Sequence, residues 1–158
     1  RMHINLQEIR GRTLSANEYL DSLETPFKEK FLSRKQTYTL NQEAVRRLKE
    51  NADKYVIIVF SAKWCKDCAA NVPVLAMIAE TTGLETRIFG NLKKDPLSHT
   101  RKWRTPPSPP EVETFNVDRI PVVIIVNKKG EEIGRIVENP KPGLTLEEEI
   151  YEIIASRK

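Results

Sequence analysis

Several features that would point to particular protein classes are scarce or missing in this chain. Its 158 residues contain two cysteines, too few for a disulfide-stabilised scaffold. The longest apolar runs, 56–60 and 121–126, are far too short to span a bilayer. The first ten residues contain no apolar stretch of the kind found in secretory signals. These absences predict a soluble, cytoplasmic protein that does not bind membranes.

Charge is unevenly distributed. The net charge is +4, and the segment 93–104 alone holds five basic residues against Asp95. This segment is interpreted either as a solvated basic loop or as an electropositive wall that attracts anionic partners or stabilises a thiolate. We expect no nucleic-acid binding, because no recognised motif accompanies the charge.

The first 54 residues are predicted to be helical. Ser15 and Glu18 have the spacing of a capping box at a helix start. Thr25 is the expected N-cap of a second helix, with Pro26 at its first position. Asn41 is the expected cap of a third. We expect these residues, 1–54, to pack as an extension on the domain formed by 55–158.

The rest of the chain alternates strand and helix signals. Pro73 falls inside one predicted helix, which Gly83 should end. We expect, in order, a strand at 55–61, a helix at 66–82, a strand at 85–90, a short helix at 97–103, strands at 121–127 and 131–137, and a final helix after the capping box Thr145–Glu148. This order predicts an α/β layer architecture.

The two cysteines, Cys65 and Cys68, lie where the first of these strands gives way to a helix. A helix N-terminus lowers the pKa of a thiol at its first turn, so the pair can be a reactive dithiol. Two alternatives stay open: an inert pair in a binding or adaptor module, or two soft ligands in a metal-handling protein. Zinc usually takes four ligands, and neither His3 nor His99 shows ligand spacing to the pair, so no metal site is predicted.

Four features together resemble the thioredoxin superfamily. A buried strand leads into Cys65-x-x-Cys68, and Pro73 follows five residues after the second cysteine. Ile120-Pro121 precedes an apolar strand, and a turn at Gly130 is followed by a terminal helix. The resemblance covers 55–158 and implies a thioredoxin-like fold: a central mixed sheet of about four strands flanked by helices. The helical N-terminus is similar to that of a thioredoxin-like group with a Trp-Cys-x-Asp-Cys motif.

The resemblance implies a thiol–disulfide oxidoreductase. Cys65 would attack a disulfide of a protein or small molecule, and Cys68 would resolve the mixed disulfide. Reducing equivalents would come from an external reductase or thiol, with no organic cofactor. By the same resemblance, the bond before Pro121 is expected to be cis, and Ile120 would offer its backbone to substrate. The alternative interpretation is that Pro121 simply begins a strand. Trp64 would either shape the contact surface or pack in the core.

The chain also departs from the family pattern. Val59 occupies the position of a buried Asp to which the family assigns proton handling, so proton transfer must use water, Asp67 or another group. Lys66 and Asp67 replace the usual Gly-Pro; Lys66 should favour the thiolate and Asp67 should oppose it. The insert 93–110 is foreign to the family, and its Trp103 would either anchor the insert or present a binding surface. The oligomeric state stays open.

Overall fold

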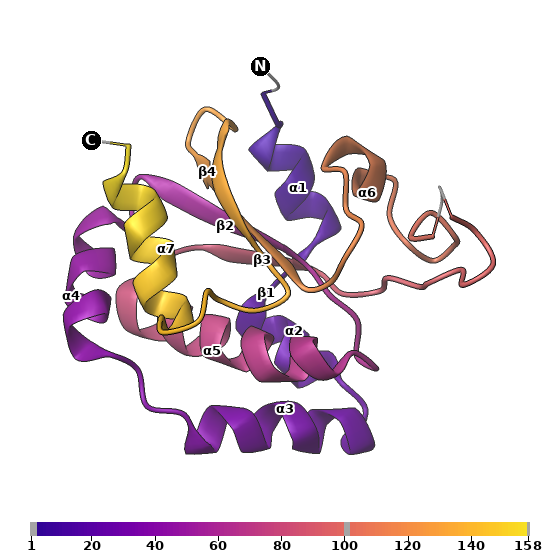
Figure 1. The fold of residues 1–158 in the computed structure, drawn as a ribbon, viewed down its shortest axis with the longest axis horizontal. Coiled ribbons are helices and arrows are strands. Elements are labelled where there is room, and N and C mark those ends of the chain that lie inside the picture. The colour runs from indigo at the N-terminus through magenta and orange to yellow at the C-terminus, as the bar shows by residue number, and fades with distance from the viewer. Residues whose placement is uncertain (1–2, 100–101, 158) are drawn as a thin grey trace.

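The computed structural model describes residues 3–99 and 102–157, which form one mixed sheet flanked by helices (Figure 1). The strands are β1 (Leu14–Ser15), β2 (Tyr55–Phe60), β3 (Thr86–Phe89), β4 (Val122–Asn127) and β5 (Glu132–Val137). The helices are α1 (Leu6–Arg12), α2 (Ala16–Ser22), α3 (Thr25–Thr37), α4 (Gln42–Asn51), α5 (Lys66–Thr82), α6 (Glu111–Thr114) and α7 (Leu146–Ala155). No helix in the described ranges is long and apolar enough to cross a membrane.

The sheet has the strand order β1-β3-β2-β4-β5, with β2 at its centre. Strand β2 runs parallel to β3 and antiparallel to β4, so Val59 pairs with Ile88 on one side and Val123 on the other. Every residue of β2 after Tyr55 is buried. The predicted α/β fold is therefore confirmed, with one strand more than the four that the sequence indicated.

That additional strand comes from the N-terminal segment. Leu14 pairs with Ile88 and extends the sheet as an antiparallel edge. The segment also contains an unpredicted first helix, α1, whose cap Asn5 accepts a hydrogen bond from the backbone N–H of Glu8 at 3.2 Å. Residues 1–54 thus contribute a strand as well as helices, and the domain boundary at residue 54 stays a prediction.

Most of the predicted helix starts are confirmed. The Ser15–Glu18 capping box is present, with the Glu18 carboxylate accepting from the Ser15 backbone N–H at 2.8 Å. The Thr145–Glu148 box has the same reciprocal pattern, and Asn41 caps α4. Short polar side chains that satisfy backbone N–H groups therefore define these starts.

The expected start of α3 is wrong by one residue. Glu24 is the N-cap and makes no side-chain capping bond, while Thr25 is already helical. Pro26 is thus at the second helical position. A proline is tolerated anywhere in the first turn because those N–H groups lack intrahelical partners.

The short helix expected at 97–103 is also wrong. The described residues on either side of the gap form turns and irregular structure. The Asp95 carboxylate accepts a hydrogen bond from the Leu97 backbone N–H at 3.0 Å, a local turn that competes with helix formation. Beyond the proline-rich stretch, the chain instead forms the single-turn helix α6.

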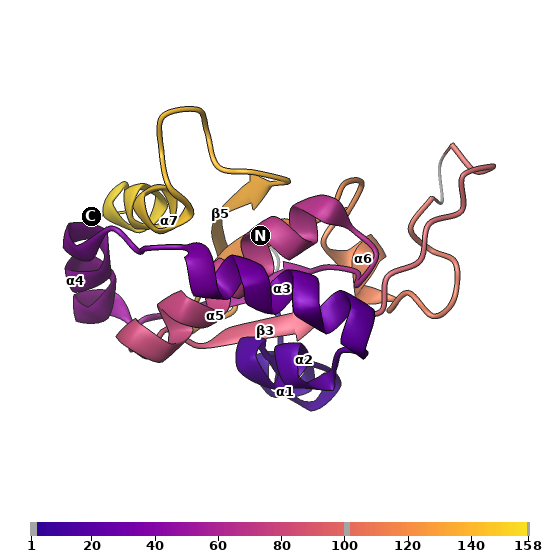
Figure 2. The same ribbon diagram turned by 90° about the horizontal axis from the view of Figure 1, so that it is seen from below.

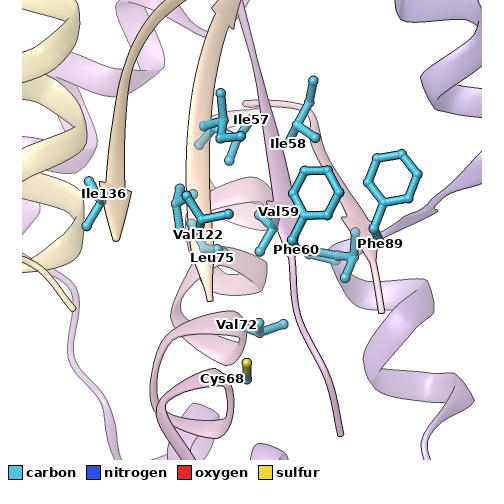
Figure 3. Close-up of a cluster of buried hydrophobic side chains, with 14 of the residues drawn as sticks. Ile57, Ile58, Val59, Phe60, Cys68, Val72, Leu75, Phe89, Val122 and Ile136 are labelled. Atoms are coloured by element: carbon cyan, nitrogen blue, oxygen red, sulfur yellow. The ribbon is translucent and has the colours of Figure 1, made fainter. Parts of the chain in front are cut away.

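The hydrophobic core lies between the sheet and α5. Figure 3 shows Val72 and Leu75 of α5 facing Val59 and Val122 of the sheet. Cys68, whose side chain is fully buried, belongs to the same cluster. Helix α3 packs on α5 on the side away from the sheet (Figures 1 and 2). The start of α5 is thereby held rigidly at the end of β2.

Candidate active site

The cysteine pair lies at the junction of β2 and α5. Cys65 is the N-cap of α5, and its Sγ accepts the backbone N–H of Cys68 at 3.2 Å. The Cys65 N–H donates to the carbonyl of Ala62 at 3.3 Å, which fixes the approach to the helix. Cys65 is half-buried, whereas Cys68 is fully buried. One sulfur is thus open to a reactant and the other lies behind it.

The surroundings of Cys65 lower the pKa of its thiol to about 7. The largest cause is a hydrogen bond from the Cys68 side chain, which stabilises the thiolate. Partial burial opposes it, while the backbone N–H groups of Cys68 and Asp67 reinforce it. The Asp67 carboxylate raises the pKa, as the sequence led us to expect. The expected contribution of Lys66, which is exposed on the first turn, stays a prediction.

The pKa of the Cys68 thiol moves in the opposite direction. Burial is the main reason that it is raised, and the adjacent Cys65 raises it further. In the reduced pair, Cys65 therefore ionises first and Cys68 keeps its proton. This is the asymmetry that an attacking thiol and a resolving thiol require.

A loop from far along the chain faces the Cys65 thiol. The backbone oxygen of Ile120 is 3.8 Å from Cys65 Sγ, and the peptide bond between Ile120 and Pro121 is cis. Both residues of the loop are buried. The structure thus brings Ile120, Pro121 and the cysteines together, while a role of the loop in substrate binding stays a prediction.

The two tryptophans form one unit beside the motif. The Trp64 and Trp103 rings stack in parallel, with centroids 6.2 Å apart. Trp103 is 7% exposed and its indole N–H donates to the backbone oxygen of Asp118 at 2.7 Å, so it anchors the insert. Trp64 is 49% exposed and lies over it. The sequence did not predict this pairing, because no local pattern links the two residues.

A charged groove opens beside Cys65. Arg119 pairs with Glu138 at 3.5 Å, but Lys94 and Lys102 have no carboxylate partner within the described ranges. The groove is lined by Trp64, Cys65, Lys66, Asp67, Lys94, Lys102, Trp103, Asp118, Arg119, Ile120 and Glu138. Part of the basic segment seen in the sequence therefore lies beside Cys65.

The described residues do not assemble a metal centre: nowhere among them do three or more His, Cys, Asp or Glu side chains converge on one point. His3 lies instead near Lys129 and Glu131. Val59 is buried at the centre of β2, so the position of the family's buried acid is apolar here.

A mixed sheet with a Cys-x-x-Cys pair at the start of a helix and a proline loop opposite defines a thioredoxin-like protein. The family model described as Thioredoxin matches residues 13–150. The chain therefore belongs to the thioredoxin superfamily. The Trp-Cys-x-Asp-Cys group within it stays a prediction.

Two solved structures share the fold over nearly the whole chain. The protein PA1234 of unknown function from Pseudomonas aeruginosa is 18% identical, with a TM-score of 0.72 over 98% of this chain and 99% of its own. An HIV epitope-scaffold is 16% identical, with a TM-score of 0.73 over 97% and 99%. Among curated proteins, none matches this sequence.

Proposed function

We propose that the protein is a thiol–disulfide oxidoreductase in which Cys65 attacks and Cys68 resolves. The observation that carries this proposal is the opposite shift of the two thiols. Cys65 has a pKa of about 7 and accepts the Cys68 N–H, while burial keeps Cys68 protonated behind it.

The reaction follows from this order. The Cys65 thiolate attacks one sulfur of a substrate disulfide, and the other sulfur leaves as a thiolate. Cys68 then attacks Cys65, so the substrate departs as a second thiol and a Cys65–Cys68 disulfide remains. An external thiol or reductase returns the pair to the dithiol. We propose no organic cofactor, and a cytoplasmic location would suit a reductant of this kind.

We infer that the groove favours disulfides that carry negative charge, because four basic side chains line it against three carboxylates. Lys94 and Lys102 line it without carboxylate partners among the described residues, and Trp64 offers an aromatic face next to Cys65. An acidic peptide or a small anionic disulfide would gain from these charges as it approaches. In this proposal the Ile120 backbone would pair with the substrate beside its disulfide.

The test is turnover of a protein disulfide, such as insulin, in the presence of an external thiol. Cys65→Ser should abolish reduction, and Cys68→Ser should trap a covalent mixed disulfide through Cys65. Ser156→Ala, at the far end of α7, serves as the control. Wild-type protein that reduces nothing, together with a Cys68→Ser variant that traps nothing, would overturn the proposal. Partner binding that survives in Cys65→Ser would then indicate an adaptor, and stoichiometric metal in the reduced protein would indicate metal handling.

A further inference from the structure

Two buried hydroxyl groups lie behind the cysteine pair. Tyr19 of α2 is 5% exposed, and Ser61, which directly follows β2, is 0% exposed. Neither Tyr19 Oη nor Ser61 Oγ makes a hydrogen bond of good geometry within residues 3–99 and 102–157. Burying a polar group without a partner costs about 1–3 kcal/mol, so two such groups side by side need an explanation.

The backbone places the Ser61 side chain at the site. Its N–H donates to the Phe89 oxygen at 2.9 Å and its carbonyl accepts from Leu92 at 3.4 Å, so both main-chain groups are occupied. The carbonyl of the next residue, Ala62, accepts a hydrogen bond from the Cys65 N–H. The Ser61 hydroxyl is the group left over, and it lies close enough to the Cys68 thiol to act on the pKa of that thiol.

The Tyr19 ring enters from the N-terminal segment. It lies so close to Gly90 that a Cβ on that glycine would come within 2.1 Å of Tyr19 Cε1. Gly90 follows Phe89, the register partner of Phe60, so it is the neighbour of Ser61 across the two parallel strands. The Tyr19 and Ser61 side chains come from separate segments, and they lie close enough together for the Ser61 hydroxyl to act on the pKa of Tyr19.

The electrostatics link the same three groups. Burial raises the pKa of Cys68 and of Tyr19, and the Ser61 hydroxyl acts against burial on both, because a hydroxyl that donates to either group favours its anion. Cys68 and Cys65 raise the pKa of Tyr19 further, so its phenol stays protonated and keeps an O–H to donate as the thiolate forms. The titratable groups that face Cys68 are Cys65 on α5 and Tyr19 on α2.

We propose that Ser61 donates a hydrogen bond to the Cys68 thiolate as it forms during resolution, and that Tyr19 donates to Ser61 Oγ and positions it. This inference rests on the proposed oxidoreductase function. It gives the two hydroxyls a different task from that of a buried acid: they stabilise the Cys68 thiolate and do not accept its proton. In this proposal Ser61 acts directly on the Cys68 sulfur, whereas Tyr19 acts through Ser61.

The step balances without another reactant. The Cys68 thiol loses its proton, and its sulfur forms a bond to Cys65 as the bond from Cys65 to the substrate sulfur breaks. The electron pair leaves on the substrate sulfur, which takes up the proton. Ser61 and Tyr19 keep their own protons, and their hydrogen bonds lower the energy of the charged sulfur.

The test uses the reduced protein and one equivalent of 5,5′-dithiobis(2-nitrobenzoate), whose coloured thiolate is released twice. The first release reports attack by Cys65 and the second reports resolution by Cys68. We expect Ser61→Ala to slow the second release about tenfold and to leave the first within about twofold, as for one lost hydrogen bond to a charged group. Tyr19→Phe should slow the second release less and move its pH profile upward. Ser61→Thr, which keeps a hydroxyl, should restore the rate.

Tyr55→Phe, at the other end of β2, is the matched control for loss of a tyrosine hydroxyl. An unchanged second release in both Ser61→Ala and Tyr19→Phe would overturn the inference, and so would equal slowing of both releases. If Ser61→Ala does not fold, Tyr19→Phe decides alone, because it keeps the ring. Wild-type protein that releases a single equivalent would instead show that the proposed function is wrong, and the inference would fall with it.

Discussion

The rate at which Cys65 reacts should rise as the pH increases through about 7, the pKa of its thiol. About half of Cys65 is then thiolate at pH 7, against about 3% of an ordinary cysteine with a pKa of about 8.5. Intrinsic nucleophilicity falls with pKa, by about fivefold over this interval. Cys65 should therefore react about threefold faster than a free thiol at pH 7 but about fourfold slower at pH 9, where both are ionised.

The assay is the pH dependence of iodoacetamide alkylation, followed by mass spectrometry of the Cys65 peptide. The midpoint of the profile is independent of how accessible the sulfur is. Cys68→Ala should move the midpoint upward, because the side-chain hydrogen bond from Cys68 is the largest cause of the lowered pKa. Asp67→Asn should move it downward by removing the opposing charge. A wild-type midpoint at or above about 8.5, the value of a free cysteine, would refute the reasoning.

Three further perturbations test other parts of the structure. Lys94→Glu combined with Lys102→Glu should slow attack on dianionic 5,5′-dithiobis(2-nitrobenzoate) several-fold at low salt. The same double variant should slow attack on neutral 2,2′-dithiodipyridine much less. Equal slowing with both disulfides would show that these charges do not select the substrate. Gly90→Ala should lower the free energy of unfolding in urea by about 1–3 kcal/mol, because its Cβ would overlap the buried Tyr19 ring. Gly11→Ala, whose Cβ would meet nothing within 4 Å, should not lower it. Tyr38→Phe should lower the free energy of unfolding by about 1–3 kcal/mol in the same assay, because the Tyr38 hydroxyl donates to the buried Glu147 carboxylate at 2.8 Å. An unchanged urea midpoint would show that this hydrogen bond adds no stability.

The elements that the sequence predicts well are those with a local signal at both ends. Helix α5 has the predicted bounds because Cys65 accepts a backbone N–H at its start and Gly83, at φ 80°, adopts the left-handed conformation at its end. Strand β2 is a continuous apolar run, which is typical of a strand buried on both faces. These two elements alone place the cysteine pair.

The elements that escaped prediction depend on contacts between distant residues. Strand β1 has two residues, too few for any periodicity, and exists because it pairs with the edge of β3. The stacking of Trp64 on Trp103 and the approach of Tyr19 to Gly90 have no local signature either. The helix expected at 97–103 is wrong for a local reason: the turn made by the Asp95 side chain competes with helix formation there.

The N-terminal segment has a structural reason to be part of the proposed redox site as well as of the fold. It pairs with β3, and it also supplies a buried phenol close to Gly90, where any side chain would collide with the ring. The phenol has no hydrogen-bond partner of good geometry among the described residues, so packing alone does not account for an oxygen there: phenylalanine would fill the same space without the cost of a buried hydroxyl. A tyrosine at this position is favoured only if its O–H gains a partner at some stage. The group that acquires charge beside it during turnover is the Cys68 sulfur, which is why the proposed role of Tyr19 belongs to resolution and not to the first attack.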